Sequence, residues 1–156
     1  MDFTMDDVER EIRRLVRENP DFVYGEQKET QELQAYGDCS YVAGITKDDF
    51  NYAKDQGLIQ AATYSDALAA GELGKACLIG QALHNLGVDH DTLETFEETG
   101  ADYVISSLEI PEGTIQNPEV FVVWAETVQR GQDNNMPWAT SLANADAKYG
   151  SRIIRA

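Results

Sequence analysis

The chain has 156 residues, of which 42% are hydrophobic, and 12 Lys and Arg stand against 28 Asp and Glu, giving a formal net charge of −16. This length and apolar content predict one globular domain, residues 1–156, and exclude general disorder. The best apolar run, residues 120–125, is far shorter than the roughly 20 residues needed to cross a bilayer. The acidic start lacks the pattern of a signal peptide, so we expect a cytoplasmic protein with no membrane partner.

The first predicted helix covers residues 4–18. Thr4 and Asp7 have the spacing of a capping box. Apolar residues recur at helical spacing and predict its buried stripe: Met5, Val8, Ile12, Leu15 and Val16. Acids precede arginines at i,i+4 spacing, which predicts a salt-bridged, solvated face rather than an anion site. These pairs are Asp6 with Arg10 and Glu9 with Arg13.

Two short apolar segments, residues 22–24 and 39–43, predict a two-stranded β-hairpin that leans on the helices. Residues 44–75 are expected to be a mobile excursion. It carries two short helices, which Thr46 and Ser65 would cap.

Residues 76–87 predict a central helix packed on most sides. Its apolar arc is wider than a surface helix needs and contains Ile79, Ala82, Leu83 and Leu86. Gly87 is placed to end the helix in a left-handed conformation. Gly80, on the opposite flank, would let a second piece of backbone approach closely.

Further helices follow in the second half of the chain. Asp89 would cap one to about residue 99, and residues 101–108 would add one or two turns. Asn117-Pro118 is a strong helix start, with a predicted end near residue 130 and a break at residues 131–135. A last helix begins at Pro137 and ends near Gly150, and residues 151–156 form a tail. The predicted fold is mainly α (α+β), with five to seven helices around the central helix and a small two-stranded hairpin.

Several short motifs are shared with one group of proteins. They are Asn-Pro-Asp-Phe-Val-Tyr at 19–24, Cys-Ser-Tyr-Val at 39–42, Cys-Leu-Ile-Gly-Gln-Ala-Leu at 77–83 with Leu-Gly-Val at 86–88, and Gln-Asp at 132–133 before Pro137-Trp138. In these motifs the chain resembles small uncharacterised acidic proteins of actinobacteria and their phages. The resemblance implies a small cytoplasmic protein of phage or prophage context. It brings no activity, cofactor or catalytic residue.

The segment between Lys75 and Arg130 contains no Lys or Arg but ten acidic residues. This half of the chain therefore lacks the cations that direct binding of nucleic acid or of an anionic membrane requires. Three interpretations of these acids remain open. They provide a solvated surface that keeps the protein soluble, they adapt the protein to high salt, or they form a face that docks a basic protein. The candidate docking surface consists of Asp89, Asp91, Glu94, Glu97, Glu98, Asp102, Glu109 and Glu112.

A zinc site is the most specific chemistry that the sequence offers, with Cys39, Cys77, His84 and His90 as candidate ligands. Against it, Cys77 and His84 lie seven residues apart on one helix, about 10.5 Å along its axis. Ordinary burial or a disulfide between the two cysteines are the alternatives. For calcium, the oxygen-bearing residues Asp89, Asp91 and Glu94 lack the loop pattern of an EF-hand and predict an acidic helix start instead.

No nucleophile elbow, phosphate-binding loop or dinucleotide-binding turn occurs in the chain. We therefore expect no catalytic residue and no cofactor. The favoured function is a non-catalytic binding or regulatory protein with a basic protein partner. The alternatives are a DNA-mimicking inhibitor of a nucleic-acid-binding protein, and a small enzyme or zinc-stabilised domain.

Overall fold

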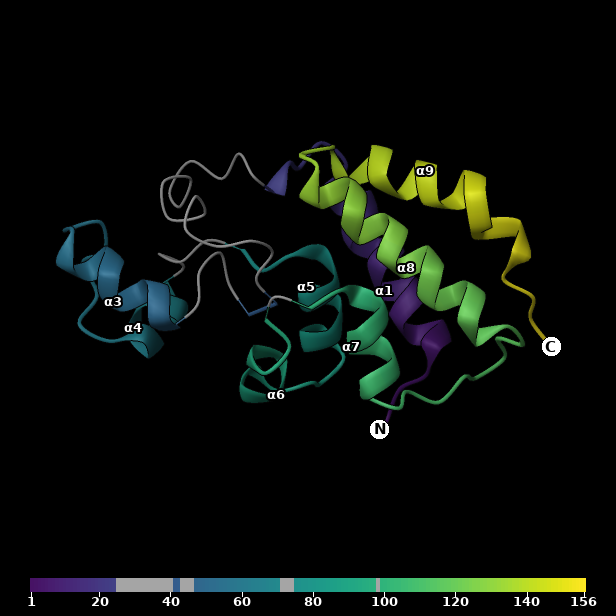
Figure 1. The fold of residues 1–156 in the computed structure, drawn as a ribbon, viewed down its shortest axis with the longest axis horizontal. Helices are drawn as coiled ribbons and strands as arrows, with labels where there is room; N and C mark the ends of the chain where they lie inside the picture. The colour runs from purple at the N-terminus through teal and green to yellow at the C-terminus, as the bar shows by residue number, and fades with distance from the viewer. Residues whose placement is uncertain (25–40, 43–46, 71–74, 98) are drawn as a thin grey trace.

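The computed structural model describes residues 1–24, 41–42, 47–70, 75–97 and 99–156 (Figure 1). These residues form eight α-helices: α1 Met5–Glu18, α3 Lys47–Asp55, α4 Tyr64–Ala70, α5 Leu78–Asn85, α6 His90–Glu94, α7 Ala101–Ser107, α8 Pro118–Asp133 and α9 Trp138–Tyr149, with a 3-10 turn η2, Gly150–Arg152, after the last. The prediction of a mainly helical protein is confirmed, although the described helices outnumber the five to seven expected. None of them has the length and apolar content to cross a membrane.

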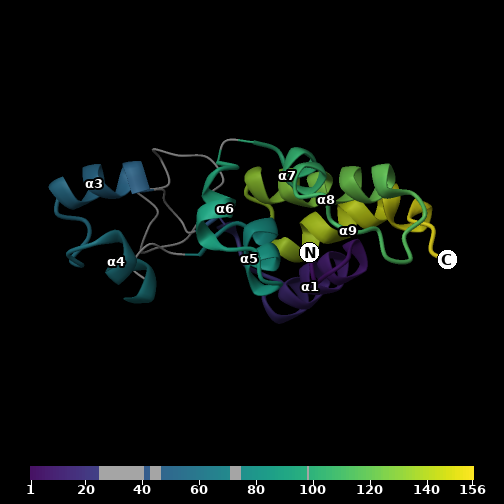
Figure 2. The same ribbon diagram turned by 90° about the horizontal axis from the view of Figure 1, so that it is seen from below.

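The helices divide into two groups along the molecule. The long helices α1, α8 and α9 pack together with α5 and α7, whereas α3 and α4 lie at the opposite end (Figures 1 and 2). The first group forms the larger hydrophobic cluster. A smaller cluster, Phe50, Ala53, Ile59, Tyr64 and Ala67, holds α3 and α4 together, and Val42 packs against both clusters. The single domain and the mobility of residues 44–75 stay predictions.

α1 follows its sequence pattern closely. Thr4 and Asp7 form the expected capping box, in which the Thr4 amide donates to Asp7 Oδ2 at 2.9 Å. All five residues of the predicted apolar stripe are buried. These local interactions explain why the start of this helix was predictable.

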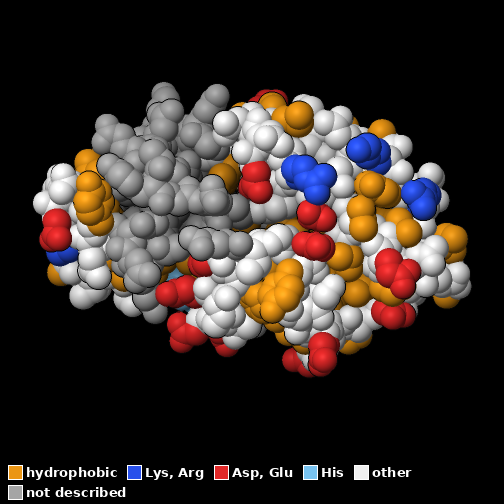
Figure 3. Space-filling model, viewed as in Figure 1, with side chains coloured by type: hydrophobic (Ala, Val, Ile, Leu, Met, Phe, Trp, Pro, Cys, Tyr) orange, Lys and Arg blue, Asp and Glu red, His pale blue; other side chains and the backbone are white. Residues whose placement is uncertain are grey.

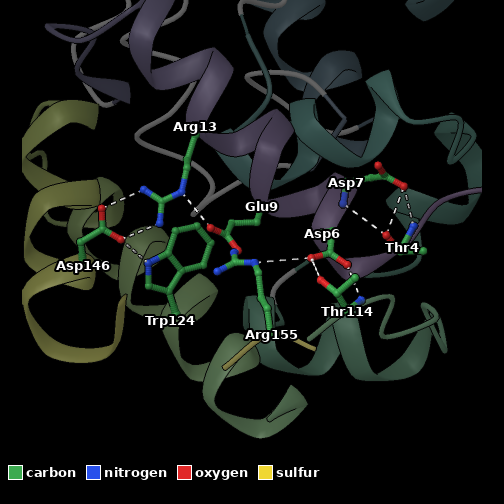
Figure 4. Close-up of polar contacts among 9 residues, drawn as sticks. All are labelled: Thr4, Asp6, Asp7, Glu9, Arg13, Thr114, Trp124, Asp146 and Arg155. Carbon is green, nitrogen blue, oxygen red and sulfur yellow. Dashed lines mark hydrogen bonds and ion pairs between the residues drawn. The ribbon is translucent and has the colours of Figure 1, made fainter. Parts of the chain in front are cut away.

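Ion pairs cover the opposite side of α1 and bind it to the C-terminal part of the chain (Figure 4). Arg13 pairs with Glu9 at 2.9 Å as predicted, and also with Asp146 of α9 at 2.8 Å. Arg10 pairs with Asp7 rather than with Asp6. Asp6 instead accepts the amide of Thr114, 2.6 Å away, and lies 3.6 Å from Arg155. The predicted ion pairing along this face is confirmed, but the face is partly buried rather than solvated, since Glu9 is buried. The Asp6–Arg10 pairing is wrong.

α5 is buried along Leu78, Ile79, Gly80, Ala82 and Leu83 and contacts α1, α6 and α8. A Cβ added at Gly80 would lie 2.3 Å from the carbonyl oxygen of Tyr41, so the predicted close approach of backbone is confirmed. Gly87 follows the helix with a φ of +112°, a conformation that glycine adopts without strain. That the other helices surround α5 stays a prediction.

A buried amide side chain connects the start of α5 to α8 and α9. Cys77, the N-cap of α5, makes no side-chain capping bond. The amide of Leu78 instead donates to Gln132 Oε1 at 2.7 Å, and the same oxygen lies 3.3 Å from Nε1 of Trp138. Gln132 is 0% exposed. It supplies the acceptor that the buried end of α5 would otherwise lack.

α8 runs further than predicted. It begins at Pro118 as expected but passes through Gly131 and ends at Asp133. A Cβ at Gly131 would lie 2.7 Å from Ser141 Oγ, so this glycine lets α9 approach α8 and does not break the helix. From the sequence alone, Gly131 and the polar residues after it looked like a helix break. The residue that requires a glycine at this position, Ser141, belongs to another helix and could not be recognised from the local sequence.

α6 is shorter than predicted, and α4 has a different cap. α6 ends at Glu94 instead of residue 99. Two threonine hydroxyls in this stretch bond to carbonyls three residues back, Thr95 to Thr92 and Thr99 to Phe96, each at 2.6 Å. Such local bonds compete with helix continuation. In α4 the side chain of Thr63, not Ser65, accepts the amide of Asp66.

The described residues contain no strand, so the predicted hairpin is not formed there. Residues 22 and 23 lie outside regular structure, Tyr24 has a 3-10 conformation, and residues 41 and 42 form a bend. The rest of the second predicted strand lies outside the described residues. Phe22 packs against the Trp138 ring with centroids 4.6 Å apart, so its apolar character serves helix contacts rather than a sheet.

The tail docks against the loop before α8. Ile153 is 5% exposed, and Ile115 and Arg155 form an isolated antiparallel bridge. The amide of Ala156 donates to the carbonyl of Thr114 at 2.7 Å. Arg155 also binds Glu9, so the C-terminus is held to α1 (Figure 4).

Replacement of Gln132 by Ala is expected to lower the free energy of unfolding by about 2–4 kcal/mol, since it removes packing and leaves two buried donors without their acceptor. Urea unfolding followed by circular dichroism measures this change. The exposed Gln116→Ala serves as the control and should change stability by less than about 0.5 kcal/mol. Equal effects of the two substitutions would contradict the role assigned to Gln132.

The ion pair with Arg13 predicts a pH-dependent contribution from Asp146. The hydrogen bonds from Arg13 hold the pKa of Asp146 below its ordinary value. Its contribution is therefore present above the unfolded pKa, about 3.9, and is lost as pH falls through the lower folded pKa. Asp146→Asn should cost about 1 kcal/mol at pH 7, because the pair is partly exposed, and less at pH 3. A difference in urea midpoint that is the same at both pH values would refute this account.

Candidate functional site

The turn between α5 and α6 brings both histidines of the chain near each other. His84 lies in the last turn of α5, and its Nδ1 is 3.1 Å from the carbonyl oxygen of Val88. A carbonyl only accepts, so Nδ1 carries the proton of the neutral ring and Nε2 is left as the acceptor. Asp89 then caps α6 as predicted, which places His90 at the first position of that helix.

A pocket of about 730 Å³ lies beside this turn, between α4 and the α5–α6 segment. His84, His90 and Asp91 lie on its wall, and Val42, Tyr64 and Leu93 contribute apolar surface. A pocket of this size, whose lining combines apolar surface with polar side chains, can hold a small ligand.

Tyr64 joins the smaller hydrophobic cluster to the pocket. Its ring stands edge-on to that of His90, with centroids 5.6 Å apart. Burial raises the pKa of Tyr64 above its ordinary value, and the negative charges of Glu94 and Glu97 raise it further. Both carboxylates therefore lie close enough to Tyr64 to disfavour its ionised form.

His90, Asp91 and Glu94 form a group of metal-ligating side chains at the edge of the pocket. One ligand atom from each lies within 4.8 Å of the others. His90 Nε2 and Glu94 Oε2 are 3.2 Å apart. Asp89, which shares this stretch of sequence, is engaged in capping instead.

Some carboxylates of the predicted acidic surface are exposed, whereas others are half-buried and interact with neighbouring residues. Glu97 is half-buried and accepts the amide of Tyr41 at 3.1 Å, and Glu94 is half-buried beside His90. Asp102 is half-buried as well. Glu98 lies outside the described residues. The exposed members of the set are Asp89, Asp91, Glu109 and Glu112.

An exposed aromatic residue lies within the same stretch of the chain. Tyr103 is 58% exposed, and its ring meets that of Phe96 edge-on at 6.2 Å. In Figure 3 hydrophobic side chains flanked by acidic ones lie over the region where Figure 1 places α6 and α7. The Lys and Arg side chains on this face lie mostly over α8 and α9.

The structure separates the candidate zinc ligands. Cys77 is 0% exposed and is a free thiol at the start of α5, whereas His84 is exposed at its end. The described wall of the pocket includes both histidines but not Cys77. Cys39 lies outside the described residues. A zinc site built from cysteines and histidines stays a prediction. Among the described residues, no group of metal ligands contains a cysteine.

The pocket was not predicted from the sequence. His84, His90 and Asp91 lie close together in the sequence, which hinted at a polar site there. The opposite wall of the pocket comes from Tyr64, a residue of α4. Only tertiary packing brings α4 to α6.

No family model, curated protein or solved structure matches this chain. The resemblance to acidic proteins of actinobacteria and their phages therefore stays a prediction.

The Cys77 thiol should be protected from reagents in the folded protein, because the residue is fully buried. In a Cys39→Ser variant we expect labelling by a thiol-specific disulfide reagent to be at least about 100-fold slower without urea than in urea, since it requires local or global opening. Absorbance of the released thiolate measures the rate. Rapid labelling of the native protein would contradict the burial of Cys77.

Proposed function

We propose that this protein is a non-catalytic binding protein whose α6–α7 surface docks a basic surface of another protein. The docking surface consists of Asp89, Asp91, Asp102, Tyr103, Glu109 and Glu112. The observation that carries the proposal is the absence of Lys and Arg from residues 76–129, where ten acids occur. Such a surface attracts partners of opposite charge and speeds their association.

The distribution of ion pairs supports this division of charge. Arg10, Arg13, Arg14 and Arg155 bind carboxylates of α1 and α9. Their charges are therefore largely offset by neighbouring carboxylates along α1 and α9. Residues 76–129 contain no Lys or Arg that could neutralise the acids of the docking surface. A basic partner would supply the missing positive charges.

Tyr103 gives the docking surface a candidate anchor. Tyrosine is enriched among the residues that dominate binding energy, and charged groups commonly surround such residues at the rim. Its 58% exposure leaves a large aromatic area for a partner to cover. A basic partner would pair its cations with the neighbouring acids and place apolar atoms or a guanidinium group against this ring.

A DNA-mimicking inhibitor is a narrower form of the same proposal. In that case the partner is a nucleic-acid-binding protein and duplex DNA competes for the docking surface. A cytoplasmic location and an origin in a phage or prophage are predictions from the sequence that accompany this proposal.

The test compares two matched variants in binding to partners isolated by cross-linking from lysate. The surface variant carries Asp102→Asn, Tyr103→Ala, Glu109→Gln and Glu112→Gln. The control variant carries Asp2→Asn, Tyr52→Ala, Asp21→Asn and Glu119→Gln, all at exposed residues. We expect the surface variant to weaken binding about 10- to 100-fold by calorimetry, and the control variant less than about threefold.

Salt supplies the second arm of this test. Wild-type affinity should fall as salt rises from 50 to 500 mM, because the charge attraction is screened. Competition by duplex DNA would favour the DNA-mimic form. Equal losses in the two variants, or an affinity that does not change with salt, would refute the proposal.

A further inference from the structure

We propose that His90, Asp91 and Glu94 bind one divalent transition-metal ion at the edge of the pocket between α4 and α6. The ligands would be the imidazole Nε2 of His90 and one carboxylate oxygen from each acid. This site shares Asp91 with the acidic docking surface, but it needs a particular set of ligand atoms and not a net charge.

The spacing of the three residues supports a common site. His90 and Glu94 are four residues apart on α6 and therefore lie on one face of the helix. Their ligand atoms are 3.2 Å apart. With metal–ligand bonds of about 2.1 Å, adjacent ligand atoms lie about 3.0–3.4 Å apart in octahedral or tetrahedral geometry. The ligand atom of Asp91, an exposed residue, lies within 4.8 Å of the other two.

The state of His90 Nε2 is a separate observation that favours a ligand. This atom is buried and makes no hydrogen bond within the described part of the chain, even though Glu94 Oε2 is 3.2 Å away. Tyr64 packs against the ring and limits its movement. A buried imidazole nitrogen has little access to water. Beside two carboxylates, it is well placed to coordinate a metal ion.

The electrostatic surroundings also favour a cation. No Lys or Arg occurs from residue 76 to residue 129, whereas Asp89 and Glu97 stand close in sequence to the three ligands. Lys75 lines the pocket, but its Nζ lies over the ring of Phe22, 5.1 Å from the centroid. A bound divalent ion would offset the negative charge of its ligands and of the neighbouring acids.

The donor set indicates which ions would bind. One imidazole with two carboxylates suits Zn²⁺, Co²⁺ and Mn²⁺, whereas Ca²⁺ and Mg²⁺ prefer oxygen ligands alone. Three protein ligands leave at least one coordination position for water or for a small molecule in the pocket. The competing explanation is a plain i,i+4 ion pair, which requires no metal.

The experiment titrates chelator-treated protein with Zn²⁺, and separately with Co²⁺, in a calorimeter. Wild type should bind one equivalent, and the visible absorption of Co²⁺ should report nitrogen and oxygen ligands. His90→Gln should weaken binding at least about 100-fold, more than the loss of a supporting residue causes. The matched control His84→Gln removes the other histidine of the same pocket and should bind within about threefold of wild type.

Two further readouts keep the result independent of folding. Circular dichroism checks that His90→Gln retains the wild-type helix content, and Glu94→Gln serves as a second ligand variant. In NMR spectra Zn²⁺ should shift the ring protons of His90 before those of His84. Absence of saturable binding up to 1 mM Zn²⁺, or binding that survives His90→Gln, would overturn the site, as would equal losses in the two histidine variants.

Discussion

The buried amide of Gln132 is the constraint on which the helical bundle depends. α5 begins inside the protein without a capping side chain, so its first amide needs an acceptor from elsewhere. Gln132 of α8 supplies that acceptor to Leu78 and also meets the indole of Trp138 at the start of α9. One side chain thereby fixes the relative positions of three helices, and an unpaired group there would be costly.

The position of α5 in turn places the functional features. Its last turn carries His84, and the tight turn through Gly87 leads directly to the cap of α6 and to His90. α1 lies against α5 and holds the arginines that pair within the bundle and with the C-terminus. Three arginines of α1 are engaged by carboxylates of α1 and α9, whereas residues 76–129 contribute ten acids and no Lys or Arg. Both the proposed docking surface and the proposed metal site draw on this division of charge.

Features decided by neighbouring residues were predictable from the sequence, and features decided by tertiary contacts were not. The capping box of Thr4 and the start of α8 at Pro118 depend on residues within one helical turn. Gly131 resembled a helix break because Ser141, the residue it accommodates, belongs to α9. Phe22 resembled a strand residue because its partner Trp138 is distant in sequence. The pocket also required the contact between α4 and α6.

The central claim is that negative potential is concentrated over α6 and α7 and is offset along α1. Paramagnetic relaxation of amide protons by a cationic and an anionic nitroxide cosolute measures this potential directly, residue by residue. The account predicts that the cationic probe relaxes amides of α6 and α7 far more strongly than the anionic probe, and that the two probes differ less along α1. A ratio that is uniform across these three helices would contradict it.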